Sequence, residues 1–323
     1  MTNSPPKVAI AMPVYNASRT IRQSLESALT QTYEDFDLFI SDNASTDDTV
    51  EIIRSYDDPR IRLHVNSHNL GYQPNMNFAI SRCHSPYIKF LHGDDLIYPT
   101  CIERMVEVMD QSDRVGMVFC RRRIDLEAGA KPDLHNFREV FEHAYQNFGE
   151  LRPVNDGRAM LRRWVAAGLT ENWVGEPSNV MMRRSALESL GLFNPRMRML
   201  DDFDMWARTM VRYDVGFVDE ELASYRFAAD NLTMTQTVAA RWFDLLWLLE
   251  GLAAEPGLLE EYPRLHRAIA EERWTVVKRL GRTITKDPGE LSSRLRVMAD
   301  YIAYRARRAV GRPAPLHPPL LTI

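Results

Sequence analysis

The sequence predicts an α/β fold in which a mostly parallel sheet is flanked by helices. Apolar runs typical of strands alternate with helical patterns through the first 124 residues, and this alternation favours a parallel sheet. With 323 residues, the chain is long enough for one large α/β domain with an additional region, or for two domains. No glycine-rich dinucleotide fingerprint follows the first run and no phosphate-loop pattern occurs, so a dinucleotide dehydrogenase or a P-loop kinase is not expected.

Five apolar runs in this first part are predicted as strands, because each is short and most end at polar or turn-forming residues. They are KVAIAMPV (7–14), FDLFIS (36–41), RIRLHVN (60–66), YIKFLH (87–92) and GMVFCRRRI (116–124). Two helical patterns lie between the early runs. In the first, four apolar residues share one helical face: Ile21, Leu25, Ala28 and Leu29. In the second, Ser45 and Asp48 resemble a capping box with Asp in place of the usual Glu.

The regularity weakens between about 125 and 230. Helices are predicted over 157–168 and 199–213, a short strand followed by a helix over 176–193, and one or two strands over 215–227. Residues after about 235 are predicted to be wholly helical.

Composition narrows the function classes. A net charge of −4 and a pI near 6.1 give no reason to expect nucleic-acid binding. No secretory signal is evident, and the most apolar later stretch, 242–259, is interrupted by three acidic residues, so no membrane span is expected. Three cysteines without metal-ligand spacing indicate reduced thiols: Cys83, Cys101 and Cys120. We therefore expect a cytoplasmic protein.

Polar residues follow four of the predicted strands, in PVYN (13–16), SDNAST (41–46), NSHNLG (66–71) and HGDD (92–95). Because ligands of parallel sheets bind beyond the carboxyl ends of the strands, these segments are the candidate site. Within HGDD, two adjacent carboxylates cost free energy unless a cation or solvent compensates them. Asp94 and Asp95 therefore either cap the following helix or hold a metal ion.

Three segments of the chain together resemble the family 2 glycosyltransferases of the GT-A fold. They are 8–53 (from VAIAMPVYN to TVEII), NLG (69–71) and FLHGDDLIYP (90–99). Further on, 176–208 is similar to the family's acceptor-side segment. The resemblance implies an inverting transfer of a sugar from a nucleoside diphosphate to an acceptor hydroxyl, in the synthesis of a surface polysaccharide or glycoconjugate. UDP is the expected donor nucleotide and dTDP the next.

The resemblance also implies a domain division. Residues 1–232 would form the GT-A catalytic domain, with a nucleotide-sugar half (1–124) and an acceptor half (125–232). Residues 233–323 would form a helical C-terminal region, in which no family pattern is found.

A divalent metal, Mn²⁺ or Mg²⁺, is implied at HGDD, because the last Asp of the family's acidic triplet reaches the ion that bridges the diphosphate. That position is Asp94, with Asp95 beside it. His92 replaces the first Asp of the triplet, where it would contact the nucleotide ribose or the metal.

The resemblance places nucleoside recognition at the earlier strand ends. The residues implied are Pro13, Tyr15 and Asn16 for base and ribose, Asp42 and Asn43 for the base, and Asn69 and Gly71 in the turn after the third strand. Taken alone, Tyr15 is equally suited to core packing and Asn16 to capping a helix.

On the acceptor side, Asp202 matches the family's general base and Asp201 takes the place of the usual Glu. The alternative is that both merely favour a helix N-terminus. Trp173, Gly175 and Glu176 are expected at the acceptor pocket, where Trp173 would stack on a sugar face. Arg226 is expected near the diphosphate, or in a surface ion pair.

The C-terminal segment 276–312 carries ten basic residues against three acidic ones. It suits either peripheral contact with an anionic membrane on its inner face or a helix packed on the catalytic domain. Three other functions compete with the transferase: a sugar-nucleotide pyrophosphorylase, a non-catalytic nucleotide- or sugar-binding protein, and a scaffold formed by the C-terminal helices. The expected partners are the nucleotide sugar and a glycan or glycolipid acceptor.

Overall fold

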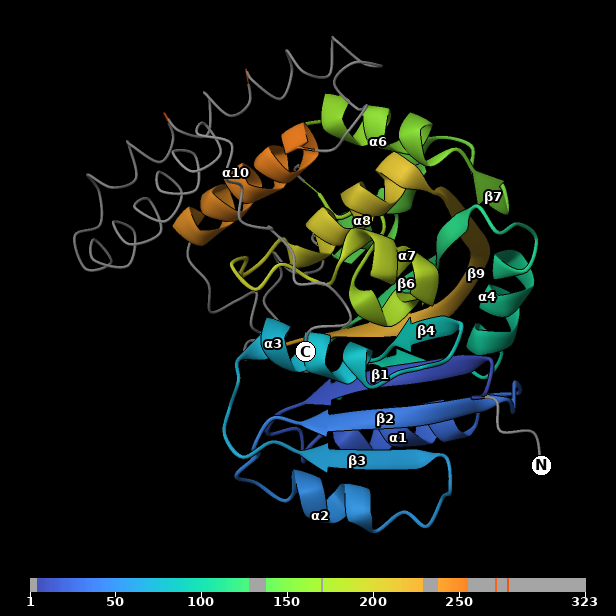
Figure 1. Cartoon of the computed structure of the whole chain (residues 1–323), viewed down its shortest axis with the longest axis vertical. Coiled ribbons are helices and arrows are strands. Elements are labelled where there is room, and N and C mark those ends of the chain that lie inside the picture. Colours follow the sequence, from blue (N-terminus) through green and yellow to red (C-terminus); the bar gives the residue numbers. More distant parts are fainter. Residues whose placement is uncertain are drawn as a thin grey trace.

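A single mixed sheet runs through the molecule, with helices on both of its faces (Figure 1). The structure is a computed structural model that describes residues 5–127, 138–169, 171–228 and 238–254, together with Glu271 and Lys278. Within these ranges the sheet has nine strands, so the predicted α/β class is confirmed.

The N-terminal part of the sheet is parallel. Its strands are β1 (Val8–Val14), β2 (Phe36–Asp42), β3 (Ile61–Val65) and β4 (Tyr87–Phe90). β1 pairs with β2 on one side and with β4 on the other, and β2 pairs with β3. All four match predicted strands, and their carboxyl ends meet at one edge of the sheet.

Alternate residues of β1 enter two separate cores, as the period of a strand requires. Ile10 belongs to the core that contains Leu25 of α1 (Ile21–Leu29). Ala11 belongs to the core that contains Met76 of α3 (Tyr72–Ser81). Because both faces of β1 are covered, the whole strand is apolar rather than alternating.

The second part of the sheet is mixed. Its strands are β5 (Leu96–Ile97), β6 (Val115–Leu126), β7 (Val154–Asn155), β8 (Val180–Arg183) and β9 (Asp214–Phe227). β8 lies antiparallel between β4 and β6, β9 runs parallel to β6, and β5 and β7 pair antiparallel with β9. The predicted strand or strands over 215–227 are one long strand, whereas β5 was not predicted because it has only two residues.

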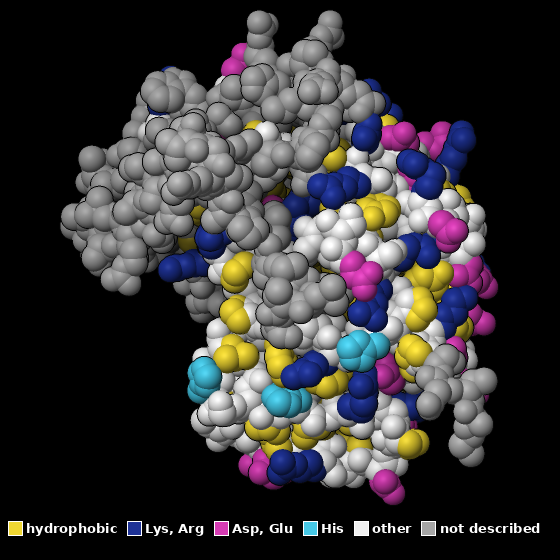
Figure 2. All heavy atoms as spheres, viewed as in Figure 1, with side chains coloured by type: hydrophobic (Ala, Val, Ile, Leu, Met, Phe, Trp, Pro, Cys, Tyr) yellow, Lys and Arg dark blue, Asp and Glu magenta, His cyan; other side chains and the backbone are white. Residues whose placement is uncertain are grey.

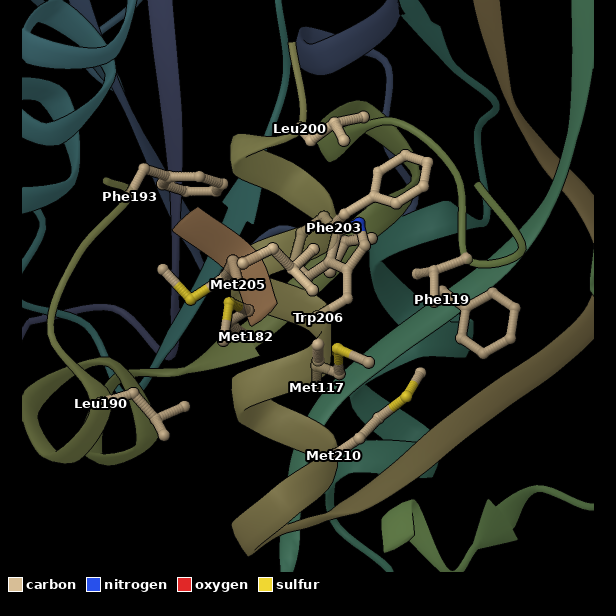
Figure 3. Close-up of a cluster of buried hydrophobic side chains, with 14 of the residues drawn as sticks. Met117, Phe119, Met182, Leu190, Phe193, Leu200, Phe203, Met205, Trp206 and Met210 are labelled. Carbon is tan, nitrogen blue, oxygen red and sulfur yellow. The ribbon is translucent and has the colours of Figure 1, made fainter. Parts of the chain in front are cut away.

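Helix α2 (Thr49–Arg54) packs beside α1. Further helices of the described residues are α4 (Cys101–Met109), α6 (Gly157–Ala166), α7 (Arg184–Leu190), α8 (Asp201–Arg212) and α10 (Val238–Ala254), with short 3₁₀ helices η1 (Ala144–Phe148) and η2 (Pro177–Asn179). Helix α8 packs between α6 and α10 (Figure 1). Its buried face includes Met205 and Trp206, which meet Met182 of β8 and Phe193 in the larger core (Figure 3).

The predicted capping box is wrong. Asp48 precedes α2 without a side-chain capping bond. Ser45 instead donates its hydroxyl to Asp42 Oδ2 at 2.5 Å and receives no bond from Asp48. The Ser–Asp spacing therefore belongs to the turn after β2 and not to the helix start.

None of the helices in the described part of the chain has the length and apolar character that a bilayer crossing requires. The basic segment 276–312 lies outside the described residues except for Lys278, as does most of 233–323, so the predicted domain division stays a prediction. On the face shown in Figure 2, basic and acidic side chains of the described residues are interspersed. The ion pairs of the described residues include Arg104–Glu220 and Arg114–Asp214.

Candidate active site

A cleft of about 590 Å³ opens beyond the carboxyl ends of β1, β2 and β4. The start of α8 and the end of β9 form its other wall. The cleft is lined by most of the residues that the sequence singled out: Pro13, Tyr15, Asn16, Asn43, Asn69, Gly71, His92, Asp94, Glu176, Asp201, Asp202 and Arg226. Four others lie elsewhere: Asp42, Asp95, Trp173 and Gly175.

The aromatic ring of Tyr15 is exposed at the end of β1, on a turn that hydrogen bonds hold in place. Tyr15 is 48% exposed, so it is not a core residue. Asn16 accepts a hydrogen bond from the Thr46 backbone N–H at 2.8 Å, and its own N–H donates to Ser45 Oγ at 2.9 Å. The residue preceding α1 is Thr20, so Asn16 does not cap that helix but joins the turns after β1 and β2.

Asn43 holds the turn that leads into α3. Its amide nitrogen donates to Asn69 Oδ1 at 3.0 Å and to the Gly71 carbonyl at 3.1 Å, and its Oδ1 accepts from Leu70 N–H at 2.8 Å. Gly71 has φ +89°, a conformation that glycine adopts without strain. The NLG segment is thereby fixed at the cleft.

Asp42 is corrected from a base-contacting residue to a residue that shapes the turn. Its side chain is buried, and its two oxygens accept from the Ser45 N–H at 2.9 Å and the Ser45 hydroxyl at 2.5 Å. No part of it lines the cleft.

The two carboxylates of HGDD have different environments. Asp94 lines the cleft, whereas Asp95 is completely buried. Asp95 Oδ2 accepts from the Ser178 hydroxyl at 2.5 Å, and Oδ1 accepts from the Arg226 backbone N–H at 3.0 Å. The predicted metal contact of Asp95 is therefore corrected, because both of its oxygens are occupied inside the protein. Neither residue caps the next helix, since Thr100 precedes α4.

His92 lies between Asp95 and Tyr72. Its Nδ1 is 3.6 Å from Asp95 Oδ2, and its Nε2 is 3.2 Å from the Tyr72 hydroxyl. Burial lowers the pKa of His92, but the hydrogen bond to Asp95 and the charges of Asp95, Asp94 and Asp201 outweigh it, so the pKa is raised above 6.5.

The surroundings of Asp94 favour a cation. Burial, and then the charge of Asp95, raise the pKa of Asp94 to about 6, although His92 and Arg226 oppose this rise. An ionised Asp94 therefore lacks full compensation from the protein. Among the described residues, no cluster of three or more His, Cys, Asp or Glu is arranged to hold a metal. A divalent ion at Asp94 would thus need oxygen ligands from phosphate or water, as Mg²⁺ sites commonly do.

The acidic pair at the start of α8 faces the same cleft. Asp202 Oδ2 accepts from Asn172 Nδ2 at 2.6 Å, and Oδ1 accepts from the Phe203 N–H at 2.8 Å. Burial, and then the charges of Asp201 and Glu176, raise the pKa of Asp202 well above its ordinary range.

Asp201 is less well satisfied than Asp202. Its Oδ2 is buried and has no hydrogen-bond partner within the described ranges. Burial, and then the charge of Asp244 in α10, raise the pKa of Asp201 to about 7. A buried carboxylate oxygen without a partner opposes folding, so a helix-start preference alone does not explain Asp201.

The predicted acceptor residues 173–176 separate into two groups. Trp173 is buried and packs edge-on to Phe148, with ring centroids 5.1 Å apart, so the predicted stacking on a sugar is wrong. Gly175 does not line the cleft but connects its wall to α8, because its carbonyl accepts a hydrogen bond from Trp206 Nε1 at 3.0 Å. With φ +107°, a Cβ there would lie 2.7 Å from the Asn179 side chain. Glu176 lines the cleft and pairs with Arg122 Nε at 2.5 Å.

Arg226 forms an ion pair at the cleft, and its expected contact with the diphosphate stays a prediction. It lines the cleft, and its Nη2 pairs with Glu127 Oε1 at 3.0 Å. The same oxygen of Glu127 pairs with Arg19 Nη2 at 2.6 Å, and Arg19 also lines the cleft.

Sequence reasoning missed several residues that shape the site: Arg19, Tyr72, Asn172, Ser178, Arg198 and Asp244. Asn172 and Ser178 lie within or beside the segment that drew attention through Glu176, but their partners are distant in sequence. Asp244 lies where no family pattern was found. Only the folded chain brings Arg19, Tyr72 and Arg198 to the cleft, and Asn172, Ser178 and Asp244 into contact with the residues around it.

A comparison with known protein families supplies the deciding observation, because the model of glycosyl transferase family 2 matches residues 9–191. The chain belongs to glycosyl transferase family 2. This membership makes the protein a glycosyltransferase and favours that activity over the pyrophosphorylase and the non-catalytic binding protein.

Relatives and solved structures agree with the family. An uncharacterized protein of Mycobacterium tuberculosis is 32% identical over 236 residues, covering 73% of this chain and 72% of its own. The putative glycosyltransferase EpsE of Bacillus subtilis is 28% identical over 214 residues, covering 64% of this chain and 67% of its own. S. aureus TarS in complex with UDP-GlcNAc superposes with a TM-score of 0.68 at 14% identity, over 92% of this chain and 80% of that one. The protein has the GT-A fold of these family members.

Proposed function

We propose that this family 2 glycosyltransferase moves a sugar, with inversion, from a nucleoside diphosphate to an acceptor hydroxyl. UDP is the proposed donor nucleotide, dTDP the next, and a divalent metal, Mn²⁺ or Mg²⁺, the proposed cofactor. The proposed role is the synthesis of a surface polysaccharide or glycoconjugate. The observation that carries the proposal is one cleft lined both by Asp94, at the end of β4, and by Asp202, at the start of α8.

The donor would occupy the half of the cleft beside β1 and β2. Tyr15 offers an exposed ring for the base, and the turn held by Asn43 lines the cleft with Asn69 and Gly71. Arg226 and Arg19 lie at the cleft wall where the diphosphate charge would need cations. Solved structures with the same fold support this class of donor: TarS was determined with UDP-GlcNAc, and the mannosyltransferase PcManGT of Pyrobaculum calidifontis with GDP-Man and Mn²⁺ (TM-score 0.53, 16% identity, covering 95% of this chain and 83% of that one).

Asp94 would hold the metal. When bound there, a divalent ion would supply positive charge to stabilise the diphosphate leaving group. The buried Asp95 orients this part of the site, because it fixes Ser178 and the Arg226 backbone on either side. His92, held by Asp95 and Tyr72, would contact the ribose.

Asp202 would act as the general base. A carboxylate with a raised pKa accepts the proton of an attacking hydroxyl more readily, and such catalysis typically contributes about 10²–10⁴-fold. Asn172 fixes the orientation of this carboxylate, and Glu176 and Asp201 border the space beside it. The acceptor would therefore enter between η2 and the start of α8.

A thermal-shift panel tests the metal and donor parts of the proposal. UDP, dTDP, GDP and CDP are each added with and without Mn²⁺ to wild type, Asp94→Ala and Asp202→Asn. At about 100 times its Kd, a ligand adds roughly 2.7 kcal/mol to stability. We expect a Mn²⁺-dependent shift with UDP that is lost in Asp94→Ala and retained in Asp202→Asn. A shift that survives Asp94→Ala would refute the assigned metal site.

Contact of 276–312 with an anionic membrane remains part of the proposal as a means of reaching a lipid-linked acceptor. Co-sedimentation of the full chain with anionic vesicles at low salt tests it. Recovery of all the protein in the supernatant would contradict it.

A further inference from the structure

Helix α8 begins without a cap of its own. The residue before it is Leu200, which has no side-chain oxygen, yet the next two residues are Asp201 and Asp202. The first N–H groups of a helix need acceptors, and capping side chains usually supply them. In the first turn of α8, the Phe203 N–H donates to Asp202 Oδ1. The backbone just before the helix is held by another part of the chain.

Asp244 of α10 supplies an acceptor for the backbone that leads into the helix. Its Oδ2 accepts from three consecutive backbone N–H groups, those of Arg198 at 2.8 Å, Met199 at 2.6 Å and Leu200 at 3.1 Å. Asp244 is only 2% exposed, so these bonds are shielded from water. Successive N–H groups that converge on one oxygen form an anion-binding nest, which fixes the backbone more tightly than one bond does.

The three residues held by Asp244 lead directly into the cleft. The side chains of Arg198 and Met199 line it, and Leu200 is followed at once by the acidic pair. Helix α10 packs against α8 over this region (Figure 1). A change in the backbone at 198–200 would therefore move Asp202 relative to the cleft.

We propose that Asp244 is a positioning residue for sugar transfer: it sets the backbone of 198–200 and thereby the place of the Asp202 carboxylate. This inference rests on the proposed function, in which Asp202 is the base. Asp202 is then held from two sides, by Asn172 at its own carboxylate and by Asp244 at the start of its helix. Helix α10 is in this respect part of the catalytic unit and not only an appendage.

The burial of a full charge supports a role beyond packing. Burial raises the pKa of Asp244 to about 6, although the three backbone N–H groups and Arg198 oppose the rise. An apolar residue at this place in a largely apolar helix would avoid that cost but would leave three N–H groups without their acceptor.

The test compares Asp244→Ala, Asp244→Asn and Leu249→Ala in the full chain. Leu249 is a buried residue of the same helix and controls for loss of packing. The readout is UDP release from UDP-GlcNAc with Mn²⁺, or from whichever UDP-sugar turns over fastest, with kcat and the donor KM determined separately. We expect Asp244→Ala to lower kcat roughly 10- to 100-fold, because small misplacements of a catalytic group have effects of that size. The donor KM should stay within about twofold of wild type, since the donor half lies elsewhere in the cleft.

Asp244→Asn keeps one acceptor oxygen and should recover most of the lost kcat. Leu249→Ala should lower the Tm at least as much as Asp244→Ala while kcat changes little. The inference is overturned if Asp244→Ala loses no more kcat than Leu249→Ala, or if both Asp244 variants lose donor binding along with kcat. Asp202→Asn distinguishes failure of the proposed base from failure of the inference about Asp244. If Asp202→Asn turns over normally, the proposed base is wrong. If Asp202→Asn is inactive while Asp244→Ala is fully active, only the inference about Asp244 fails.

Discussion

Asp94 and Asp95 are neighbours in the chain, but only Asp94 reaches the cleft, because Asp95 is turned inward to Ser178 and the backbone of Arg226. The inner carboxylate keeps the end of β4 in place beside η2 and the end of β9. Its charge also helps to raise the pKa of Asp94. One residue of the pair thus builds the site in which the other would bind its ligand.

Substitution of the two residues should have different consequences. Asp94→Ala should abolish Mn²⁺-dependent nucleotide binding without loss of stability, because its carboxylate faces the cleft and burial raises its pKa. Asp95→Ala should cost about 1–3 kcal/mol of stability, because it leaves the buried Ser178 hydroxyl and the Arg226 N–H without their acceptor. Urea unfolding and nucleotide titration of both variants measure this. Equal loss of stability in the two variants would contradict the assignment.

The pH dependence of transfer should reflect the acidic pair of α8. The base acts only when ionised, and burial raises the pKa of Asp201 to about 7 and that of Asp202 well above its ordinary range. We therefore expect kcat/KM to fall on the acid side at a pH well above the ordinary carboxylate value of about 4, because the pKa of Asp202 is raised.

Asp201→Asn provides the matched variant for this profile. It removes the charge that raises the pKa of Asp202, so the acid limb should move to lower pH. An acid limb at the same pH in both proteins would show that Asp202 is not the group that titrates.

The same substitution should stabilise the protein at high pH. The pKa of Asp201 rises from 3.8 to about 7 on folding, so the stability linked to its protonated form is complete below about pH 4 and is lost as the pH rises through 7. Asp201→Asn should therefore raise the free energy of unfolding at pH 8 by up to about 4 kcal/mol and leave it nearly unchanged at pH 4. Denaturant unfolding at the two pH values measures the difference. A variant that is less stable than wild type at pH 8 would argue against the buried, uncompensated carboxylate.

Glu127 should weaken donor binding. One of its oxygens pairs with both Arg19 and Arg226, two residues of the cleft wall that are proposed to meet the diphosphate. Glu127→Gln should tighten UDP binding a few-fold at low salt, with a smaller effect at high salt because exposed charges are screened. Calorimetric titration at two ionic strengths measures this. Arg226→Gln should weaken UDP binding. Equal UDP affinities in wild type, Glu127→Gln and Arg226→Gln would show that the arginines do not bind the phosphates.

The sequence predicted the parts of the fold that depend on local pattern. The four parallel strands and α1 follow from short apolar runs and one helical stripe, and the strand ends that form the cleft follow from the geometry of parallel sheets. Strand β5 has too few residues to show a strand pattern. The turn after β2 is too irregular for a sequence pattern to predict its hydrogen bonds. The Ser45–Asp48 spacing suggested a capping box only because the competing bond from Ser45 to Asp42 is not visible in a linear pattern.

Local sequence patterns could not predict the direction in which the side chains of the site point. Asp95 turns inward because of Ser178, a residue 83 positions away. Trp173 packs inward because Phe148 and the larger core surround it. Asp244 belongs to a helix whose composition marks it only as buried, and its three backbone partners become known only when α10 is placed beside α8. Such contacts depend on the assembled fold and not on local propensity.

The most direct test of the central claim is the steady-state rate of nucleotide release from UDP-sugars in wild type, Asp94→Ala and Asp202→Asn, each with Mn²⁺ and with EDTA. We expect Mn²⁺-dependent turnover in wild type only, with loss of donor binding in Asp94→Ala and loss of kcat with retained donor binding in Asp202→Asn. Wild-type turnover that persists in both variants would contradict a transfer reaction carried out by these two carboxylates.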